Sequence, residues 1–463
     1  MLSENKMAAF NIASTAIVAS INFLTIPIFT RMLDTSGYGL VNIYVAWVQI
    51  CTMIVGLQSQ GSIGSAKANL ADDEQSSYQL SVLVMSVFPF AGVMLGCCVF
   101  AAPLSNWLAM PAPLVICMPL QSFGAFLVSF FSMRFIFEKE AQKNLMISVG
   151  LCIASTALSI FLIVFAFPSA DAFFGRVLGL MIPNLFIGLL LLAILIVRRG
   201  KSSIKVKYWR FCLVLSLPLV LHGLSQVLLS QTGKIAIQQM WDDSLAGIYS
   251  IAVVVVGLMS AIYNALNNAF VPFMYDDLAG KTTELVKRSH FTNYLTLFTE
   301  GSCAFVLLSP EILKVMSPES YWAAIDVLPL LVIGQYCVFL YSFPVNYEFY
   351  KMRTASVAVG TVLAAFLCVL LSFSLTSHLG MHGAAIATMI AYLALFLFHF
   401  CIARYRLGDR NYPARSLFGG LALVVVVAIG CYSLMDYVFA RWAIGVCLLV
   451  AALFRIWRNK TIF

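Results

Sequence analysis

Residues 173–197 read FFGRVLGLMIPNLFIGLLLLAILIV, and residues 198–210 continue as RRGKSSIKVKYWR. A helix needs roughly 20 mostly apolar residues to cross about 30 Å of hydrocarbon, and the first segment meets that length. The second segment carries six basic residues within 13 positions. An apolar membrane span followed by a basic connector at the membrane surface is therefore the simplest interpretation.

This alternation recurs along all 463 residues, of which 61% are hydrophobic and 10% are charged. The apolar segments are apolar on every face, whereas the strands of a membrane barrel alternate in polarity over about ten residues. We therefore predict an all-α polytopic membrane protein with about 14 transmembrane helices. The predicted spans are residues 7–30, 39–60, 78–104, 112–133, 145–167, 173–197, 211–235, 245–270, 291–309, 322–346, 355–376, 382–403, 416–437 and 440–456.

The basic residues divide unevenly between the two sides of this topology. With a cytoplasmic N-terminus, 23 of the 28 lysines and arginines fall on the cytoplasmic side. The other side keeps Arg31, Arg176, Lys234, Lys314 and Arg441. Because cytoplasmic loops are enriched in Lys and Arg, we expect a multi-pass protein with both termini in the cytoplasm. The net charge of +8 is then explained by topology and anionic lipid rather than by nucleic acid.

The 12 cysteines lie in or beside the predicted spans, without CxxC or Cys/His spacing. Metal sites and disulfide frameworks depend on such spacings. We expect these side chains to pack as apolar groups, and we expect neither a metal nor another cofactor.

The basic connector 198–210 separates the first six spans from the next six. Two pairs of segments are similar across it: SGYGLVNIYVA (36–46) with LAGIYSIAVVV (245–255), and FFGRVLGLMI (173–182) with MHGAAIATMI (381–390). The alternative explanation is that apolar helices resemble one another through composition.

An internal repeat would give two lobes of six helices each. Halves with an even number of helices keep the same orientation and are related by an axis along the membrane normal. We predict an N-lobe at residues 1–200 and a C-lobe at residues 201–410, with a central cavity between them. Residues 411–463 would add two helices outside this pseudosymmetric core.

Four segments, in chain order, resemble those of the polysaccharide flippases, the Wzx-type O-antigen and capsule exporters of the multidrug/oligosaccharidyl-lipid/polysaccharide exporter superfamily. They are FLTIPIFTRMLDTSGYGLVNIY (23–44), LLSQTGKIAIQQMWDDSLAGIYSIA (228–252), NALNNAFVPFMYDDL (264–278) and GMHGAAIATMIAY (380–392). The similarity covers the first twelve predicted helices. Each segment alone is weakly specific, and the specificity comes from their order and from the helix count.

The resemblance implies a protein of the bacterial inner membrane that is not an enzyme. Such a protein flips an undecaprenyl-diphosphate-linked oligosaccharide from the cytoplasmic to the periplasmic leaflet, by alternating access between two lobes. The oligosaccharide serves O-antigen, capsule or exopolysaccharide synthesis. Membrane lipids are further partners, and the polymerase and chain-length regulator of the same pathway are additional candidates.

Three cations are predicted at membrane depth toward the periplasmic end: Arg31, Arg176 and Lys234. Charges inside a membrane cost a few kcal/mol and usually face a cavity or one another. These three are candidates for binding the lipid diphosphate, because a guanidinium pairs two anionic oxygens at once and an ammonium offers a point charge. The alternative is that the side chains snorkel to the outer headgroups.

Neutral polar residues accompany these cations. A stripe with a spacing of four residues lies on one side of the helix that begins near residue 211, and it consists of His222, Gln226, Ser230, Lys234 and Gln238. Hydrogen-bonding groups of this kind suit a path for sugars, whereas polar packing between helices is the alternative. The resemblance places further candidates on helices that line the cavity, namely Asn11, Asn22, Asn42, Gln49, Asn264 and Asn268.

Glu300 is the one acid near the centre of a predicted span, in LTLFTEGSCAF. It is a candidate site for coupling to protons or sodium. Two alternatives stay open: an ion pair with a cation on another helix, and a neutral, hydrogen-bonded acid. The family often carries an acid just before the cation that corresponds to Lys234, but residues 231–233 here are Gln, Thr and Gly.

Four other functions compete with the polysaccharide flippase. A cation-coupled multidrug exporter of the same superfamily is expected to carry several acids in its lobes, and the sequence offers essentially one. A lipid II flippase also has 14 helices and stays open. A membrane O-antigen polymerase needs a sizeable loop outside the membrane, yet the longest outer connections are about ten residues long. A channel would need a ring-forming filter motif.

Overall fold

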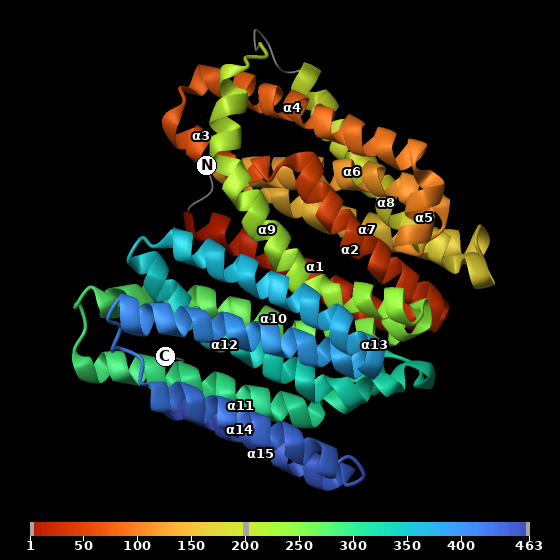
Figure 1. Cartoon of the computed structure of the whole chain (residues 1–463). Coiled ribbons are helices and arrows are strands. Elements are labelled where there is room, and N and C mark those ends of the chain that lie inside the picture. The colour runs from red at the N-terminus through yellow and green to blue at the C-terminus, as the bar shows by residue number, and fades with distance from the viewer. Residues whose placement is uncertain (1–3, 198–202, 460–463) are drawn as a thin grey trace. The chain divides into compact units, whose positions relative to one another are not determined.

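The computed structural model describes residues 4–197 and 203–459, apart from the side chains of residues 4–9, 11, 12, 458 and 459. All regular structure within these ranges is helical (Figure 1). Thirteen of the described helices are long and apolar enough to cross a membrane. The prediction of an all-α polytopic membrane protein is confirmed.

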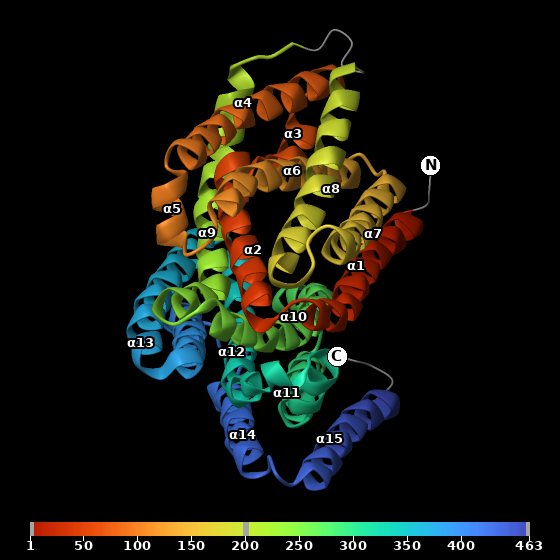
Figure 2. The same cartoon turned by 90° about the vertical axis from the view of Figure 1, so that its right-hand side faces the viewer.

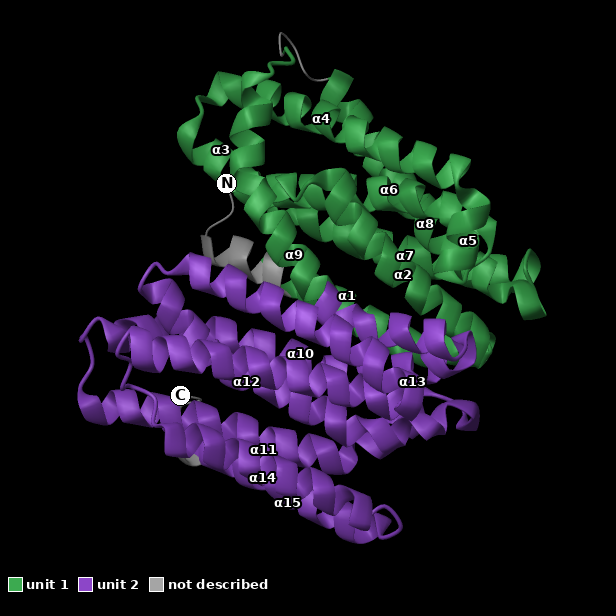
Figure 3. Ribbon diagram, viewed as in Figure 1, with its two compact units in different colours: residues 1–227 green, residues 228–463 purple. Residues whose placement is uncertain are grey.

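The chain divides into two compact units, residues 1–227 and 228–463 (Figure 3). The division falls within a single helix, α9 (Lys207–Met240). The connector 198–210, on which the lobe boundary was predicted, lies partly outside the described residues. The lobes at residues 1–200 and 201–410 therefore stay a prediction.

Unit 1 contains eight helices before α9. They are α1 (Glu4–Met32), α2 (Thr35–Gly56), α3 (Ile63–Asn69), α4 (Asp72–Val99), α5 (Ala101–Leu108), α6 (Ala112–Phe137), α7 (Ala141–Phe165) and α8 (Ala172–Val197), with 3-10 turns η1 (Ser59–Ser62) and η2 (Ser169–Asp171). The short helices α3 and α5 follow predicted spans and were not expected.

Helix α6 is central to the packing of unit 1, since it contacts α2, α4 and α8. Its close approach to α8 depends on Gly124, where an added Cβ would lie 2.6 Å from the backbone nitrogen of Leu185. Small residues allow such close packing of membrane helices. Helix α7 contacts both α1 and α8, so α1, α7 and α8 pack as one group.

The first part of α9 belongs to unit 1 through polar contacts with α4. The hydroxyl of Tyr208 donates to Glu74 Oε1 at 2.7 Å, and the indole of Trp209 donates to the carbonyl of Ser81 at 2.8 Å. These contacts explain why the division lies inside α9 and not before it.

Unit 2 contains the remainder of α9 and six further helices. They are α10 (Asp243–Leu278), α11 (Glu284–Met316), α12 (Leu328–Tyr350), α13 (Thr354–Cys401), α14 (Ala414–Ser433) and α15 (Val438–Asn459), with the 3-10 segment η3 (Glu319–Val327) and the π-helical segment η4 (Ile402–Arg406). Helix α12 contacts α10, α11, α13 and α14, and both α14 and α15 pack on α11 (Figure 2).

Helix α13 combines two predicted spans, residues 355–376 and 382–403. The helix is broken at Gly380, which has φ 54° and ψ −131°. Residues with a side chain rarely adopt this backbone conformation, whereas glycine adopts it without steric cost. The chain reverses at this glycine, so the two halves of α13 correspond to the two predicted spans.

Aspartates cap the starts of α2 in unit 1 and α10 in unit 2. Asp34 accepts a hydrogen bond from the backbone N–H of Gly37 at the start of α2, and Asp242 accepts one from that of Leu245 at the start of α10, each at 2.7 Å. An Asp at this position satisfies an otherwise unpaired N–H of the first turn. The two caps precede the similar segments 36–46 and 245–255. Whether the lobes superpose stays a prediction.

Candidate functional sites

Arg176 of α8 lies where this helix meets α1 and α7 in unit 1. Its Nη1 donates to the hydroxyl of Ser159 on α7 at 3.0 Å, and its guanidinium carbon is 3.7 Å from the ring centroid of Phe29 on α1. Such a cation–π contact stabilises a guanidinium by about 0.5–2 kcal/mol. The side chain is half-buried, and no carboxylate pairs with it among the described residues.

Three of the candidate asparagines lie on α1 and α2, namely Asn11, Asn22 and Asn42. Asn22 is exposed and accepts a weak hydrogen bond from the thiol of Cys152, at 3.4 Å. Cys152 and Ser159 are seven residues apart on α7, so they share a face of that helix. The structure thus brings Asn22 and Arg176 to the same face of α7.

The other polar candidates of α1 and α2 are Asn42, Gln49, Arg31 and Asn11. Asn42 donates to the carbonyl of Tyr38 one turn earlier, at 2.9 Å, and Gln49 is exposed. Arg31 is exposed and donates to the carbonyl of Pro27 at 2.9 Å. The side chain of Asn11 lies outside the described part of the structure.

The polar stripe of α9 falls on both sides of the division into units. His222 is half-buried and Gln226 exposed in unit 1, whereas Ser230, Lys234 and Gln238 belong to unit 2. Gln238 is buried, and its side-chain amide donates to Asp243 Oδ1 on α10 at 2.7 Å.

Lys234 is only 6% exposed. No hydrogen bond or ion pair joins it to any other described residue. A buried charge is costly unless another group compensates it. Lys234 is therefore a basic side chain held inside unit 2 without a protein counter-charge in the described ranges.

A cavity of about 150 Å³ lies in unit 2, one helical turn from Lys234 along α9. Polar and aromatic side chains from four helices line it: Ser230, Tyr249, Ser260, Gln335, Thr388 and Tyr392. Hydroxyl, amide and aromatic groups of this kind bind sugars, because they combine hydrogen bonds with flat apolar faces. The sequence pattern identified only Ser230 in this set.

The candidates on α10 lie further along that helix. Asn264 and Asn268 are exposed, and Asn267 between them accepts a hydrogen bond from the amide of Asn346 on α12 at 3.1 Å. These residues do not line the cavity beside Ser230.

Glu300 pairs with a cation of the C-terminal helix. Its Oε1 accepts from Arg455 Nη2 at 2.7 Å, which joins α11 to α15. A second pair joins the same helices, since Arg441 binds both carboxylate oxygens of Glu311. The structure thus has the ion pair that was one alternative for Glu300, and no described feature tests a coupling role.

Two further acids lie near the ends of long helices, Glu311 in α11 and Glu348 in α12. Glu348 is fully buried, and its Oε1 lies 2.6 Å from Nδ1 of His399 on α13, which is also fully buried. The predicted span ended at residue 346, whereas α12 continues to Tyr350. A histidine within the apolar run 382–403 was the only local signal for this pair.

The fold defined by these helices is that of the transporters of the MOP superfamily. The lipid II flippase MurJ in its inward closed conformation is similar with a TM-score of 0.65 and 13% identity, over 99% of this chain and 100% of that chain. An inward-facing multidrug resistance MATE family transporter of this superfamily has a TM-score of 0.64 at 12% identity, over 86% of this chain and 98% of that chain. At such identities the likeness establishes the fold alone.

Within this class, the chain belongs to the family described as polysaccharide biosynthesis protein, whose profile matches residues 6–276. Two relatives come from Haemophilus influenzae. One, named uncharacterized membrane protein, is 24% identical over 80% of this chain and 87% of its own length. The other, named Lsg locus putative protein 1, is 22% identical over 76% of this chain and 86% of its own length. The resemblance drawn from the four sequence segments is thereby confirmed.

Proposed function

We propose that the protein is a flippase for lipid-linked oligosaccharides. Its substrate would be an oligosaccharide repeat unit on undecaprenyl diphosphate, moved from the cytoplasmic to the periplasmic leaflet of the bacterial inner membrane by alternating access. Membership of the polysaccharide biosynthesis family and the MOP-type fold support this class of transporter.

The observation that carries the proposal is the unpaired, buried ammonium of Lys234. Arg441 and Arg455 of α15, by contrast, each pair with a glutamate of α11. An uncompensated charge costs several kcal/mol in a protein interior, and a bound anion removes that cost. The diphosphate of a lipid-linked sugar is such an anion, so Lys234 would favour its entry.

Arg176 offers a second cation, in unit 1. A guanidinium has five N–H donors in a planar fork, and Ser159 is the only described hydrogen-bond partner of Arg176. The remaining donors suit two anionic oxygens of one phosphoryl group. Both cations therefore fit a substrate with a strongly anionic, multiply hydrogen-bonding group.

The cavity beside Ser230 would contact the sugars. Its volume of about 150 Å³ is below the range of roughly 300–1,000 Å³ that is typical of sites enclosing a whole small ligand. Unit 2 would enclose only a part of an oligosaccharide there. Tyr249 and Tyr392 would pack against sugar rings, while Gln335 and Thr388 would bind hydroxyl groups.

The test is restoration of surface polysaccharide in a strain that lacks the gene. Wild-type protein and Arg415→Gln, which removes an exposed cation of α14, should restore the polymer. Lys234→Ala should abolish export, Lys234→Arg should retain part of it, and Arg176→Ala should reduce it, with membrane levels of each protein measured in parallel. Wild-type export by both alanine variants would contradict the proposal.

A second strain separates this function from lipid II transport. Depletion of the resident lipid II flippase stops growth, and our protein should not restore it. Full rescue by the wild-type chain would assign the substrate to lipid II instead.

A further inference from the structure

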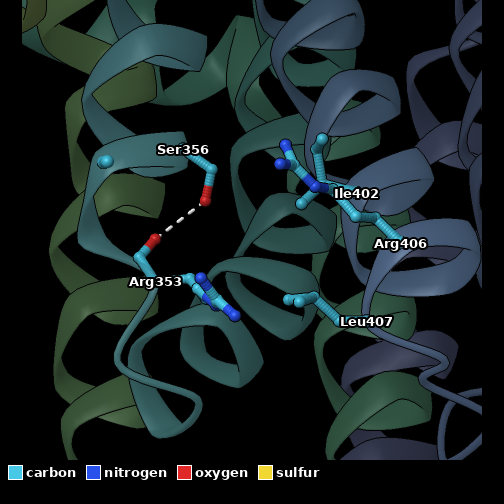
Figure 4. Close-up of a pocket in the computed structure, with 6 residues that line it drawn as sticks. Arg353, Ser356, Ile402, Arg406 and Leu407 are labelled. Atoms are coloured by element: carbon cyan, nitrogen blue, oxygen red, sulfur yellow. Dashed lines mark hydrogen bonds between the residues drawn. The ribbon is translucent and has the colours of Figure 1, made fainter.

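A pocket of about 230 Å³ lies in unit 2, where the connection between α12 and α13 faces η4. Arg353, Ala355 and Ser356 line one side, and Ile402, Arg406 and Leu407 line the other. Figure 4 shows the side chains of Arg353 and Arg406 extending from these two segments toward the space between them. The pocket does not share a lining residue with the cavity beside Ser230.

The lining carries two positive charges and no acid. Among the described residues neither Arg353 nor Arg406 forms an ion pair. Arg353 also directly precedes the first turn of α13, where N–H groups and the helix dipole add a partial positive charge. Guanidinium groups from two sides, together with a helix N-terminus, favour the oxygens of a phosphate.

Two features fix the walls of this pocket. The π-helical turn of η4 closes with a hydrogen bond from the N–H of Leu407 to the carbonyl of Ile402, at 3.0 Å, and single π turns occur often at functional sites. The hydroxyl of Ser356 contacts both the carbonyl of Arg353 and the carboxylate of Glu348.

Glu348 is an acid that lies behind the pocket, where it contacts the lining residue Ser356. Its carboxylate is fully buried between α12 and α13, where it lies within hydrogen-bond distance of His399 and accepts a hydrogen bond from Ser356. The arginines line the open space, and Glu348 does not. The electrostatic balance within the pocket is therefore positive.

The surroundings suit a lipid rather than a free anion. Because α13 reverses at Gly380, its first residues and η4 lie at the same end of the helix pair, which is the end that the basic residues predict to be cytoplasmic. Met352 is 88% exposed and Tyr405 is 81% exposed, and each directly precedes an arginine of the pocket. Exposed apolar and aromatic side chains beside cations are typical of the headgroup level of a membrane.

We propose that this pocket binds the phosphate of an anionic phospholipid, with Arg353 and Arg406 as its two ligands and the exposed apolar side chains beside the acyl chains. Basic pockets between membrane helices on the cytoplasmic side bind anionic headgroups in this way. The site is separate from Lys234 and Arg176, and it does not depend on the function proposed above.

The test compares three forms of the full-length protein, purified in nanodiscs of phosphatidylcholine with a minor fraction of phosphatidylglycerol. Native mass spectrometry after release counts the phosphatidylglycerol molecules that each form retains. The pocket variant is Arg353→Gln with Arg406→Gln. The control is Arg410→Gln with Arg415→Gln, which removes two exposed cations from the same predicted side.

Wild type and control should each retain one more phosphatidylglycerol than the pocket variant. Titration with labelled phosphatidylglycerol should show binding weakened about 30-fold in the pocket variant, from roughly a fivefold loss per arginine. The variant Arg353→Lys with Arg406→Lys should retain much of the binding, which shows that the fold is intact. Equal retention by all forms would overturn the proposal.

The source of the phosphate is tested by competition. Millimolar inorganic phosphate should leave the retained phosphatidylglycerol in place. If inorganic phosphate displaces it completely and binds wild type but not the pocket variant, the site takes a free anion and the assignment to a lipid is wrong.

Discussion

Arg441 of α15 and Glu311 of α11 form a two-point ion pair inside unit 2, with Nη2 to Oε1 at 2.6 Å and Nη1 to Oε2 at 2.9 Å. Nη1 also donates to the carbonyl of Leu307 at 3.0 Å. Arg441 is 1% exposed. Helix α15 is thus attached to α11 by an ion pair whose arginine is buried, in addition to its apolar contacts.

Removal of one partner should destabilise the protein. Arg441→Leu leaves the Glu311 carboxylate without its cation, and breaking a buried pair in this way costs about 3–5 kcal/mol. The midpoint of thermal unfolding of the purified protein should fall clearly. The double variant Arg441→Leu with Glu311→Leu should recover much of that loss. Lys67→Ala is the matched control, because its pair with Asp72 is exposed and such pairs contribute about 1 kcal/mol or less.

The same reasoning applies to Glu300, which forms the second ion pair between α11 and α15. If Glu300 serves to hold Arg455, then Glu300→Gln should lower thermal stability and leave polysaccharide export largely intact. The exchange Glu300→Arg with Arg455→Glu should restore stability. Loss of export in a fully stable Glu300→Gln protein would instead support the coupling role.

Gly380 should tolerate no other residue well. Gly380→Ala places a side chain at φ 54° and ψ −131°, which costs about 1–3 kcal/mol. Gly430→Ala in α14 is the control, because an added Cβ there meets no atom within 4 Å. Unfolding midpoints should fall for Gly380→Ala and stay level or rise for Gly430→Ala. Equal midpoints would contradict the reversal at Gly380.

Asp409, in the connection between η4 and α14, should make stability depend on pH. Burial raises the pKa of the Asp409 carboxyl above its ordinary value. The folded state therefore holds this proton more tightly than the unfolded state, and stability from this group falls as the pH rises through the interval between the two pKa values. Asp409→Asn should flatten that slope at pH values above the ordinary pKa of an aspartate. An unchanged slope would show that Asp409 contributes little.

The spans could be predicted from sequence because hydropathy over about 20 residues is a local property. Glu348 was missed because its helix runs one turn beyond the apolar run. The partners of Glu300 and Glu311 are 155 and 130 positions away, and a single sequence carries no signal for which helices touch. Lys234 was identified because its spacing of four from Ser230 and Gln238 is local too. Only the structure shows that Lys234 has no protein partner among the described residues.

The central claim is that the buried cation Lys234 binds the diphosphate of the substrate. It is tested most directly in cells that lack the polymerase, where lipid-linked repeat units accumulate and a membrane-impermeant glycosidase or lectin detects those in the periplasmic leaflet. Lys234→Met keeps the length of the side chain and removes its charge. We predict that repeat units stay inaccessible with Lys234→Met and become accessible with wild type and with Arg415→Gln. Equal accessibility with Lys234→Met and wild type would contradict the account.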